Sequence, residues 1–376
     1  MNKKKSLFYC VLLLLPLCGL LFHWLYLREA IQKAYEGGAD IFTKFLLNTL
    51  YPRFEIEKHR FDLSFFLSKA DQVVLRATLV YYVLIAMSLF YKLRIHFREK
   101  FDRFWYASTS SFNINTLRWL FFSYLIFLSY ELCHDLLVLQ PISIFYKPIL
   151  WLRLLHIPFP NEIVVWILAC CWLLINILIL LRIRIVLFSA FSLCIFFLVQ
   201  CWVFSFEKLD HSYATFTYAF LLLPFLFDEQ KKNGDHFNSW SLQLIRFTIV
   251  MIYFLSGLEK LLISKFSWME ANTLKGYLSL HPTHWSDLIA QNDLLCVFIS
   301  VFTLVFQVTF VLILFFPRYS WLWLLAGICF HTGTLVVMGI GYPLNPWWWV
   351  YIFFVDWEKI YSFLLRRFNK VERSVH

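Results

Sequence analysis

Apolar runs of about twenty residues recur along this sequence and restrict the folds that it can adopt. A helix needs about 20 mostly apolar residues to cross the hydrocarbon core of a bilayer. Candidate spans lie at roughly residues 6–27, 71–91, 117–139, 163–181, 185–206, 212–227, 241–262, 293–316, 319–341 and 347–365. Only 15% of the residues are charged, against about 25% in soluble domains. We therefore predict an all-α fold, a polytopic integral membrane helical bundle with about nine or ten spanning helices in the lipid bilayer.

The first apolar run follows Lys3, Lys4 and Lys5, an arrangement that secretory signal peptides also show. The run is long for a signal peptide, and no clear small-x-small cleavage site follows it. We therefore expect an uncleaved membrane anchor.

Lysine and arginine residues in the loops indicate the orientation, because cytoplasmic loops carry an excess of both. With a cytoplasmic N-terminus, the dense basic loop 92–103 lies on the cytoplasmic side, with the basic pairs of 182–184 and 231–232. Segment 28–70 has seven basic and six acidic residues and is predicted to be outer and partly amphipathic. We predict a multi-pass protein with both termini cytoplasmic, in the cell (inner) membrane if the source is bacterial.

These patterns divide the chain into three predicted parts. Residues 1–114 hold the anchor, the amphipathic outer segment and the second span, residues 115–365 form the main transmembrane domain, and residues 366–376 form a basic cytoplasmic tail. The net charge of +10 comes from loop residues that orient helices. No nucleic-acid motif is present, so we expect no nucleic-acid partner.

Cysteine and histidine spacing gives little indication of a metal site. The nine cysteines lie almost entirely inside apolar runs, without Cys-x-x-Cys spacing, which favours small lipid-facing or core residues. Glu131-x-x-His134 resembles half of a carboxylate–histidine metal motif, and His281-x-x-His284 is a second pair at one-turn spacing if that loop is helical. Hydrogen-bonded polar groups at the membrane interface are the alternative. Because no second Glu-x-x-His completes the motif, we expect no metal.

Ionisable residues inside or beside a span are costly and therefore mark candidate functional sites. In the predicted orientation Asp210 and His211, between the fifth and sixth spans, share the outer side with Lys260, at the end of the seventh. His331 lies in the middle of the ninth span. The alternative for Lys260 is a helix-end side chain that extends its ammonium group to the interface.

A polar stripe on the seventh span leads to Lys260. Tyr253, Ser256 and Lys260 are three and four residues apart, so they lie on one side of a helix. A lysine in an apolar environment can be held as the neutral amine and act as a general base. The adjacent Glu259 would favour the charged form if both share one pocket, and the sequence leaves that balance open.

The stretch Tyr253–Leu261 (YFLSGLEKL), followed by Ser267–Glu270 (SWME), resembles the core motif of the vitamin K-dependent γ-carboxylase superfamily. Bacterial members of that superfamily are the horizontally transferred transmembrane (HTTM) domain proteins. Three further segments agree with the superfamily in the same order: Pro141–Pro148, Asp210–Tyr213 and Phe330–Ile340. The resemblance covers roughly residues 115–360.

The resemblance implies a quinol pocket between spans, opening toward the outer face, with Lys260 and His211 as its catalytic residues. In the carboxylase the matching lysine is regarded as the base that deprotonates vitamin K hydroquinone, and the matching histidine supports it. Oxygen then yields a strong base that removes a γ-proton from a peptide Glu, and CO2 adds to the carbanion. The implied cofactor is vitamin K hydroquinone or a menaquinol-type quinol. We predict that these further residues contact the quinol: Tyr253, Ser256, Trp268, His331 and Asp210.

Two departures bear on the reaction. The carboxylase has a large lumenal β-rich region that helps to bind its protein substrate, whereas this chain ends shortly after the last predicted span. Glu259 stands where the animal enzyme has another Lys, and Asp210 where it has Asn. These departures argue against carboxylation of a protein Glu more than against quinol chemistry.

Two functions of different classes follow. The first is a γ-carboxylase-like membrane protein that binds a quinol and couples its oxidation by O2 to proton abstraction or carboxylation, on a protein or small-molecule acceptor. Whether it is an enzyme, of the γ-glutamyl carboxylase lyase or ligase type, stays open. The second is a non-enzymatic multi-pass membrane protein that assists secretion or immunity, as attributed to some HTTM relatives. A bound quinone in the purified protein distinguishes the two.

Overall fold

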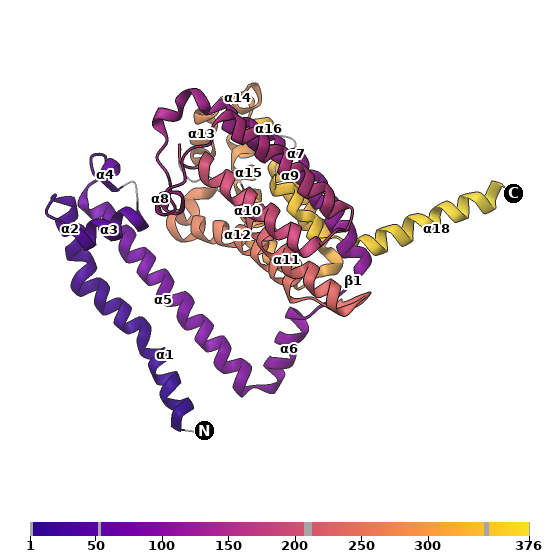
Figure 1. Cartoon of the computed structure of the whole chain (residues 1–376), viewed down its shortest axis with the longest axis horizontal. Helices are drawn as coiled ribbons and strands as arrows, with labels where there is room; N and C mark the ends of the chain where they lie inside the picture. Colours follow the sequence, from indigo (N-terminus) through magenta and orange to yellow (C-terminus); the bar gives the residue numbers. More distant parts are fainter. Residues whose placement is uncertain (1–2, 52–53, 207–212, 342–345, 376) are drawn as a thin grey trace. The chain divides into compact units, whose positions relative to one another are not determined.

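Helices make up nearly all of the regular structure in the computed structural model, which describes residues 3–51, 54–206, 213–341 and 346–375 (Figure 1). By its internal contacts the chain divides into two units, Met1–Phe104 and Trp105–His376.

The first unit is built on two long helices, α1 and α5, that pack against each other. Its helices are α1 Lys3–Phe22, α2 Arg28–Tyr35, α3 Ile41–Leu50, α4 Phe54–Glu57, α5 Leu63–Leu93 and α6 Ile95–Trp105. A π-helical turn, His23–Leu27, joins α1 to α2, and in it the Arg28 N–H donates to the carbonyl of His23, five residues earlier. A small apolar core holds α2, α4 and the start of α5 together, with Phe54 and Phe66 both buried.

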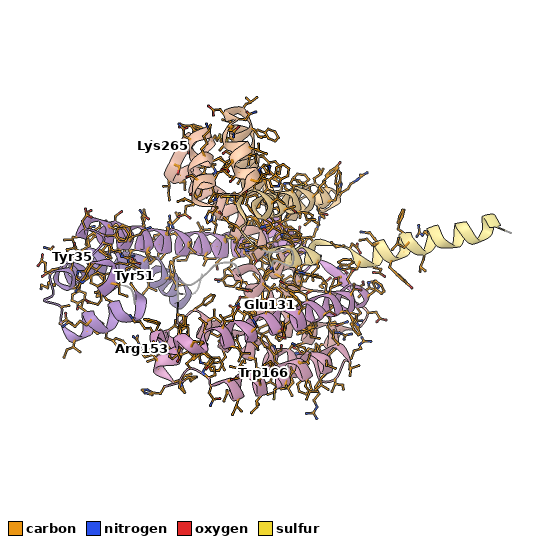
Figure 2. The ribbon with its side chains drawn as sticks, turned by 90° about the horizontal axis from the view of Figure 1, so that it is seen from above. Tyr35, Tyr51, Glu131, Arg153, Trp166 and Lys265 are labelled. Atoms are coloured by element: carbon orange, nitrogen blue, oxygen red, sulfur yellow. The ribbon has the colours of Figure 1, made fainter. Side chains whose placement is uncertain are left out.

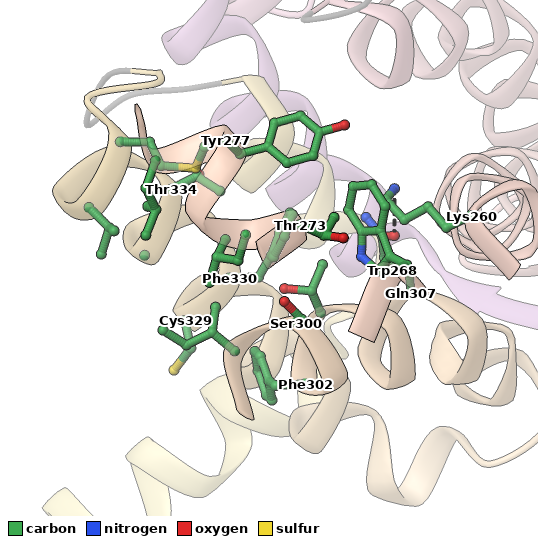
Figure 3. A pocket seen from close by; sticks show the side chains of 17 residues that line it. Lys260, Trp268, Thr273, Tyr277, Ser300, Phe302, Gln307, Cys329, Phe330 and Thr334 are labelled. Atoms are coloured by element: carbon green, nitrogen blue, oxygen red, sulfur yellow. Dashed lines mark hydrogen bonds between the residues drawn. The ribbon is translucent and has the colours of Figure 1, made fainter. Parts of the chain in front are cut away.

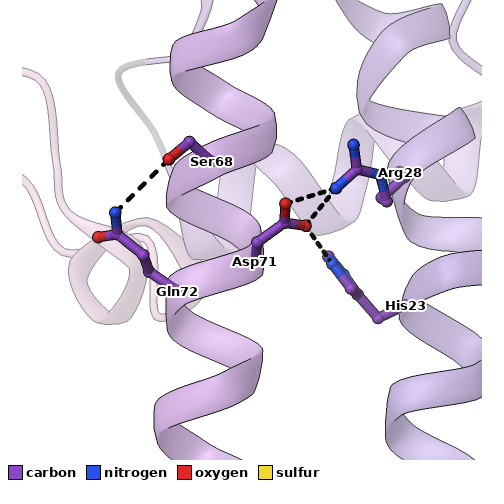
Figure 4. A network of polar contacts seen from close by, with 5 residues as sticks. All are labelled: His23, Arg28, Ser68, Asp71 and Gln72. Atoms are coloured by element: carbon purple, nitrogen blue, oxygen red, sulfur yellow. Dashed lines mark hydrogen bonds and ion pairs between the residues drawn. The ribbon is translucent and has the colours of Figure 1, made fainter.

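A charged group links the helices of this first unit (Figure 4). Asp71 on α5 accepts a hydrogen bond from Arg28 Nη1 at 2.5 Å and lies 2.7 Å from Nε2 of the buried His23. Opposite charges placed together reduce the cost of ionisable groups among apolar helices. The link therefore fixes the π-helical turn against α5.

The second unit holds the larger bundle. Its elements before the site are β1 Ser108–Ser110, α7 Ser111–Val138, a 3₁₀ turn Gln140–Phe145, α8 Leu150–Leu154, α9 Glu162–Leu180, α10 Ile185–Val203, α11 Ala214–Asn233 and β2 His236–Asn238. The later elements are α12 Trp240–Ser264, η3 Lys265–Met269, α13 Ala271–Leu280, α14 His284–Ala290, α15 Asp293–Thr309, η4 Phe310–Leu314, η5 Pro317–Tyr319, α16 Ser320–Met338, α17 Pro346–Trp349, η6 Val350–Phe354 and α18 Trp357–Val375.

Aromatic side chains fill the centre of the second unit. Helix α7 packs on α9 and α10, α11 on α10 and α12, and α12 on α15. Phe121 of α7 stacks on Phe216 of α11 with ring centroids 4.4 Å apart, and Phe196 and Phe220 close the same cluster. The strands β1 and β2 pair antiparallel, Ser108 opposite Asn238, and so tie the start of α7 to the end of α11. Many large apolar side chains also lie on the outer surface, among them Trp166 of α9, which is 50% exposed (Figure 2).

The predicted fold class is confirmed, because the described residues form an all-α bundle of apolar helices. Within the described ranges, eight helices are long and apolar enough to cross a membrane: Leu12–Tyr35, Leu63–Leu93, Ser111–Val138, Glu162–Leu180, Ile185–Val203, Trp240–Met269, Asp293–Leu314 and Pro317–Met338. With an apolar exterior, this architecture is that of a multi-pass membrane protein.

Two of the ten predicted spans are not among these eight helices. Residues 212–227 fall largely within α11, which continues into a charged last turn, so that its apolar part is shorter than the about 20 residues that a span needs. The prediction of one helix over 347–365 is wrong. The chain there forms α17 and a 3₁₀ turn, and α18 begins only at Trp357, after Asp356.

Candidate functional site

A cavity of about 300 Å³ lies in the second unit, with walls from α12, η3, α13, α15 and α16. Most of its lining is apolar or aromatic. Figure 3 shows Lys260, Trp268 and Gln307 together at one end and Cys329 away from them. The cavity therefore has one polar end in an otherwise apolar wall.

Lys260 is fixed at that polar end by three neighbours. Its Nζ donates hydrogen bonds to Ser256 Oγ at 2.9 Å and to Gln307 Oε1 at 3.0 Å. Ser256 lies one helical turn earlier on α12, and Gln307 comes from α15. The ammonium also lies 5.0 Å from the ring centre of Trp268 on η3, within cation–π range. The lysine head is thus held by two helices and one aromatic ring.

A glycine allows α15 to come close enough for this contact. A Cβ atom added to Gly257 would lie 2.9 Å from the Cβ of Gln307, 2.9 Å from Val308 Cγ2 and 3.0 Å from the backbone nitrogen of Val308. Close helix approach at small residues is a common mode of packing between membrane helices. Gly257, one turn before Lys260, therefore sets the separation at which Gln307 can bind the lysine.

The remainder of the cavity is suited to an aromatic ligand. Trp268 and Tyr277 contact each other with ring centroids 5.4 Å apart, and Phe302 and Phe330 also face the space. Hydroxyl groups are available from Ser300 and from threonines of α13, α15 and α16.

Tyr253 and His331 form a separate polar cluster. The Tyr253 hydroxyl lies 2.7 Å from His331 Nε2 and 2.8 Å from the hydroxyl of Tyr351. Phe330 and Thr334, the neighbours of His331 on α16, line the cavity, whereas Tyr253 and His331 are not among the described lining residues. The half-buried histidine thus has a tyrosine partner.

The predicted site residues that the structure describes are distributed over two places, the cavity and the Tyr253–His331 cluster. Lys260 and Trp268 line the cavity, and Ser256 holds Lys260 in position. Asp210 and His211 lie outside the described residues, so the predicted approach of His211 to Lys260 stays a prediction.

Gln307 and Ser300 are functional candidates that the sequence analysis missed. Both are polar side chains inside the apolar run 293–316, and a search for uncharged polar residues within spans would have found them.

Within the described residues, the fold adds no further ligands to the Glu131/His134 pair or the His281/His284 pair considered for a metal. His134 is exposed on α7, and His281 follows α13 while His284 begins α14, so this pair does not share one helix. Among the described residues, no group of three or more His, Cys, Asp or Glu could hold a metal ion.

Comparisons of the chain with protein-family models, curated proteins and solved structures found no match. The resemblance to the γ-carboxylase superfamily therefore stays a prediction.

Proposed function

We propose that this multi-pass membrane protein binds the ring of a lipid quinol in the Lys260 cavity and oxidises it with O2, using Lys260 as the base. The observation that carries the proposal is the polar end of the cavity. Among the described lining residues, Lys260 is the only basic side chain, and aromatic walls surround it. The motif around Lys260 that resembles the carboxylase superfamily supports the same ligand class.

The cavity fits the head of a quinol better than a whole lipid. Its volume of about 300 Å³ is at the lower end of the about 300–1,000 Å³ of small-molecule pockets. A one- or two-ring head group can stack on Trp268 and Tyr277, while an isoprenoid tail would continue outside, among the apolar helices. Ser300 offers a hydroxyl to a second ring oxygen.

The hydrogen bonds of Lys260 orient its nitrogen for proton transfer. A neutral amine has two N–H groups and one lone pair. The two nearest acceptors, Ser256 Oγ and Gln307 Oε1, can accept both N–H groups, and the Ser256 carbonyl oxygen lies farther away, at 3.4 Å. The lone pair then has neither of the two nearest acceptors as a partner and can accept a phenolic proton from a ligand in the cavity. A bound quinol supplies two electrons and two protons, for which O2 is the acceptor. The chain's own contribution is to bind the ring, orient the amine and take up the proton.

The first test is mass spectrometry of lipids extracted from the full chain purified in mild detergent. Lys260→Met removes the amine but keeps an unbranched side chain. Lys265→Met is the matched control, because Lys265 is exposed, five residues away and outside the cavity lining. We expect a quinone in the wild type and in Lys265→Met, and at least about a ten-fold loss in Lys260→Met, which corresponds to about 1.4 kcal/mol.

The second test is hydroquinone-dependent oxygen consumption. A general base typically contributes about 10²–10⁴-fold, so Lys260→Met should lose at least about 100-fold while Lys265→Met keeps the wild-type rate. Equal rates in both variants contradict the role of Lys260. If the wild type carries no quinone and oxidises none, the non-enzymatic role in secretion or immunity is the better account.

A further inference from the structure

A second and larger cleft, of about 1040 Å³, lies in the second unit where α7 begins and α11 ends. The tight turn between α9 and α10 forms its other wall. Among its lining residues are Ser111 and Asn115 of α7, Arg182 and Arg184 of the turn, and Lys231 and Asp235 at the end of α11. It shares no lining residue with the Lys260 cavity.

Positive charge exceeds negative charge in this cleft. Three basic side chains line it, against the single carboxylate of Asp235. The neighbouring acids on α11 are engaged elsewhere, because Asp228 pairs with Lys232 at 2.5 Å and Glu229 accepts hydrogen bonds from two serines. Within the described residues, Arg184 and Lys231 make no ion pair, so their charges face the cleft without a counter-ion.

Asn115 adds a hydrogen-bond donor to the lining of the cleft. Asn115 Oδ1 accepts hydrogen bonds from Arg182 Nη2 at 3.1 Å and from Gln230 Nε2 at 3.3 Å. Its oxygen is therefore occupied, and its amide Nδ2 has no partner in the part of the chain that the structure describes. Unused N–H donors beside cations suit an anion with several acceptor oxygens.

A buried arginine adds to the positive potential. Arg118 follows Asn115 by three residues on the same face of α7 and is only 2% exposed. Its Nε and Nη1 have no hydrogen-bond partner among the described residues, and it is close enough to Arg182 for the two charges to repel. A buried cation without a partner is costly, and a nearby anion would reduce that cost.

The turn that carries two of these arginines has an unfavourable backbone conformation. Arg182 and Arg184 have φ values of 65° and 39°, in the left-handed region that residues with a side chain rarely adopt. Such conformations persist where the surrounding structure requires them, commonly at ligand sites. Both arginines are thus presented to the cleft at a cost in local stability.

We propose that this cleft binds a phosphate group, supplied by the head group of an anionic membrane lipid. Arginine guanidinium groups bind phosphate oxygens in pairs. The predicted orientation places Arg182 and Arg184 on the cytoplasmic side, and Lys231 lines the same cleft. Anionic lipids are enriched on that side, and basic pockets between helices bind their head groups. Free phosphate has the same chemistry, and the experiment separates the two sources.

The test uses the full chain in a neutral detergent, with unfolding temperature followed by tryptophan fluorescence as each probe is titrated. The probes are phosphatidylglycerol, diacylglycerol (which lacks the phosphate) and inorganic phosphate at constant ionic strength. The variant is the double substitution Arg184→Gln with Lys231→Gln. Lys232→Gln is the matched control, since Lys232 follows Lys231 but pairs with Asp228 and does not line the cleft.

Each basic residue near an anionic lipid contributes roughly five-fold in affinity. The double variant should therefore bind phosphatidylglycerol about 25-fold more weakly than the wild type, while Lys232→Gln stays within about two-fold and diacylglycerol does not bind. If inorganic phosphate binds with the same dependence on the two residues, the phosphate site stands and its source is soluble. Equal lipid affinity in wild type and double variant, or an equal loss in Lys232→Gln, overturns the proposal. If the double variant does not fold, Lys231→Gln against Lys232→Gln gives the same comparison, with about a five-fold loss expected.

Discussion

Gly257→Ala is the most direct test of how the Lys260 site is assembled. The added methyl group would meet Gln307 and Val308 at 2.9 Å, and one of its neighbours is backbone, which cannot rotate away. Overpacking of a tight interface costs about 1–3 kcal/mol. The helix α15 would have to move, and Gln307 would move away from Lys260 with it.

The matched control is Gly276→Ala on α13, because a Cβ added there meets nothing within 4 Å. Both substitutions gain the same helix propensity of about 1 kcal/mol, so the difference between the two variants isolates the steric effect. We expect Gly257→Ala to be less stable than Gly276→Ala by about 1–3 kcal/mol, or at least about 2–4 °C in unfolding temperature.

The first assay is thermal unfolding of each variant in detergent, followed by tryptophan fluorescence. The second is mass spectrometry of the lipids extracted from each variant. Equal unfolding temperatures for the two alanine variants would refute the close contact of α12 with α15. A destabilised Gly257→Ala that carried as much of the proposed quinone as the wild type would show that Gln307 is not needed for that ligand.

Three further predictions concern other parts of the chain. Asp71→Asn should destabilise the first unit by about 1.5–3 kcal/mol, the contribution of hydrogen bonds to charged groups, as measured by chemical unfolding. Gly327→Ala should destabilise the second unit more than Gly257→Ala does, because the new methyl group would overlap the ring and hydroxyl of the buried Tyr351, again measured by unfolding temperature. Burial works to raise the pKa of Asp356, but hydrogen bonds from Lys359 and Asn113 together with the charge of Lys359 lower it by more, so that this pKa lies below its usual value. The stability that ionised Asp356 contributes is therefore present above pH 3.8 and lost as the pH falls through the lowered pKa. Asp356→Asn should unfold at a lower temperature than the wild type at pH 7. The two proteins should unfold at the same temperature at a pH well below the lowered pKa.

Each of these has an outcome that contradicts it. Asp62→Asn is the control for Asp71, since the Asp62 side chain makes no capping hydrogen bond at the start of α5, and an equal loss in both would point to general charge effects. A Gly327→Ala variant as stable as Gly276→Ala would place Tyr351 away from α16. A difference between Asp356→Asn and wild type that stayed constant from pH 7 to well below the lowered pKa would exclude the ionised carboxylate as its cause.

The fold followed from the sequence where a helix is apolar along its whole length. The runs that became α9 and α10 have no charged residue inside them apart from Glu162 in the first turn, so length alone identified them. Prediction failed at 347–365, where the chain forms α17, a 3₁₀ turn and, from Trp357, the amphipathic helix α18. A composition window averages the apolar residues before Asp356 with the mixed apolar and charged residues of α18. The periodicity of the apolar residues, rather than the mean hydropathy of that window, distinguishes α18 from a spanning helix.

The site was predictable only along one helix. The spacing of Ser256 and Lys260 gave their contact, because residues four apart on a helix are neighbours. Gln307 reaches the lysine from 47 residues away, through a helix contact that no local pattern encodes. Arg182 and Arg184 entered the sequence analysis only as orientation signals, since a left-handed backbone and a shared cleft appear only in three dimensions.

The π-helical turn at His23–Leu27 has a consequence for changes in chain length. In a regular α-helix, residues five apart point about 140° away from each other, whereas the wider turn lets His23 and Arg28 both reach Asp71. Such a turn accommodates one additional residue within an otherwise α-helical stretch. Deleting Leu25 would therefore restore a regular helix, keep the two basic residues one turn apart, and leave the face of α1 toward α5 unchanged. The same deletion at Gly19 would rotate everything before it by about 100°. Length variation in this first span is thus tolerated at one position and disruptive a turn and a half away.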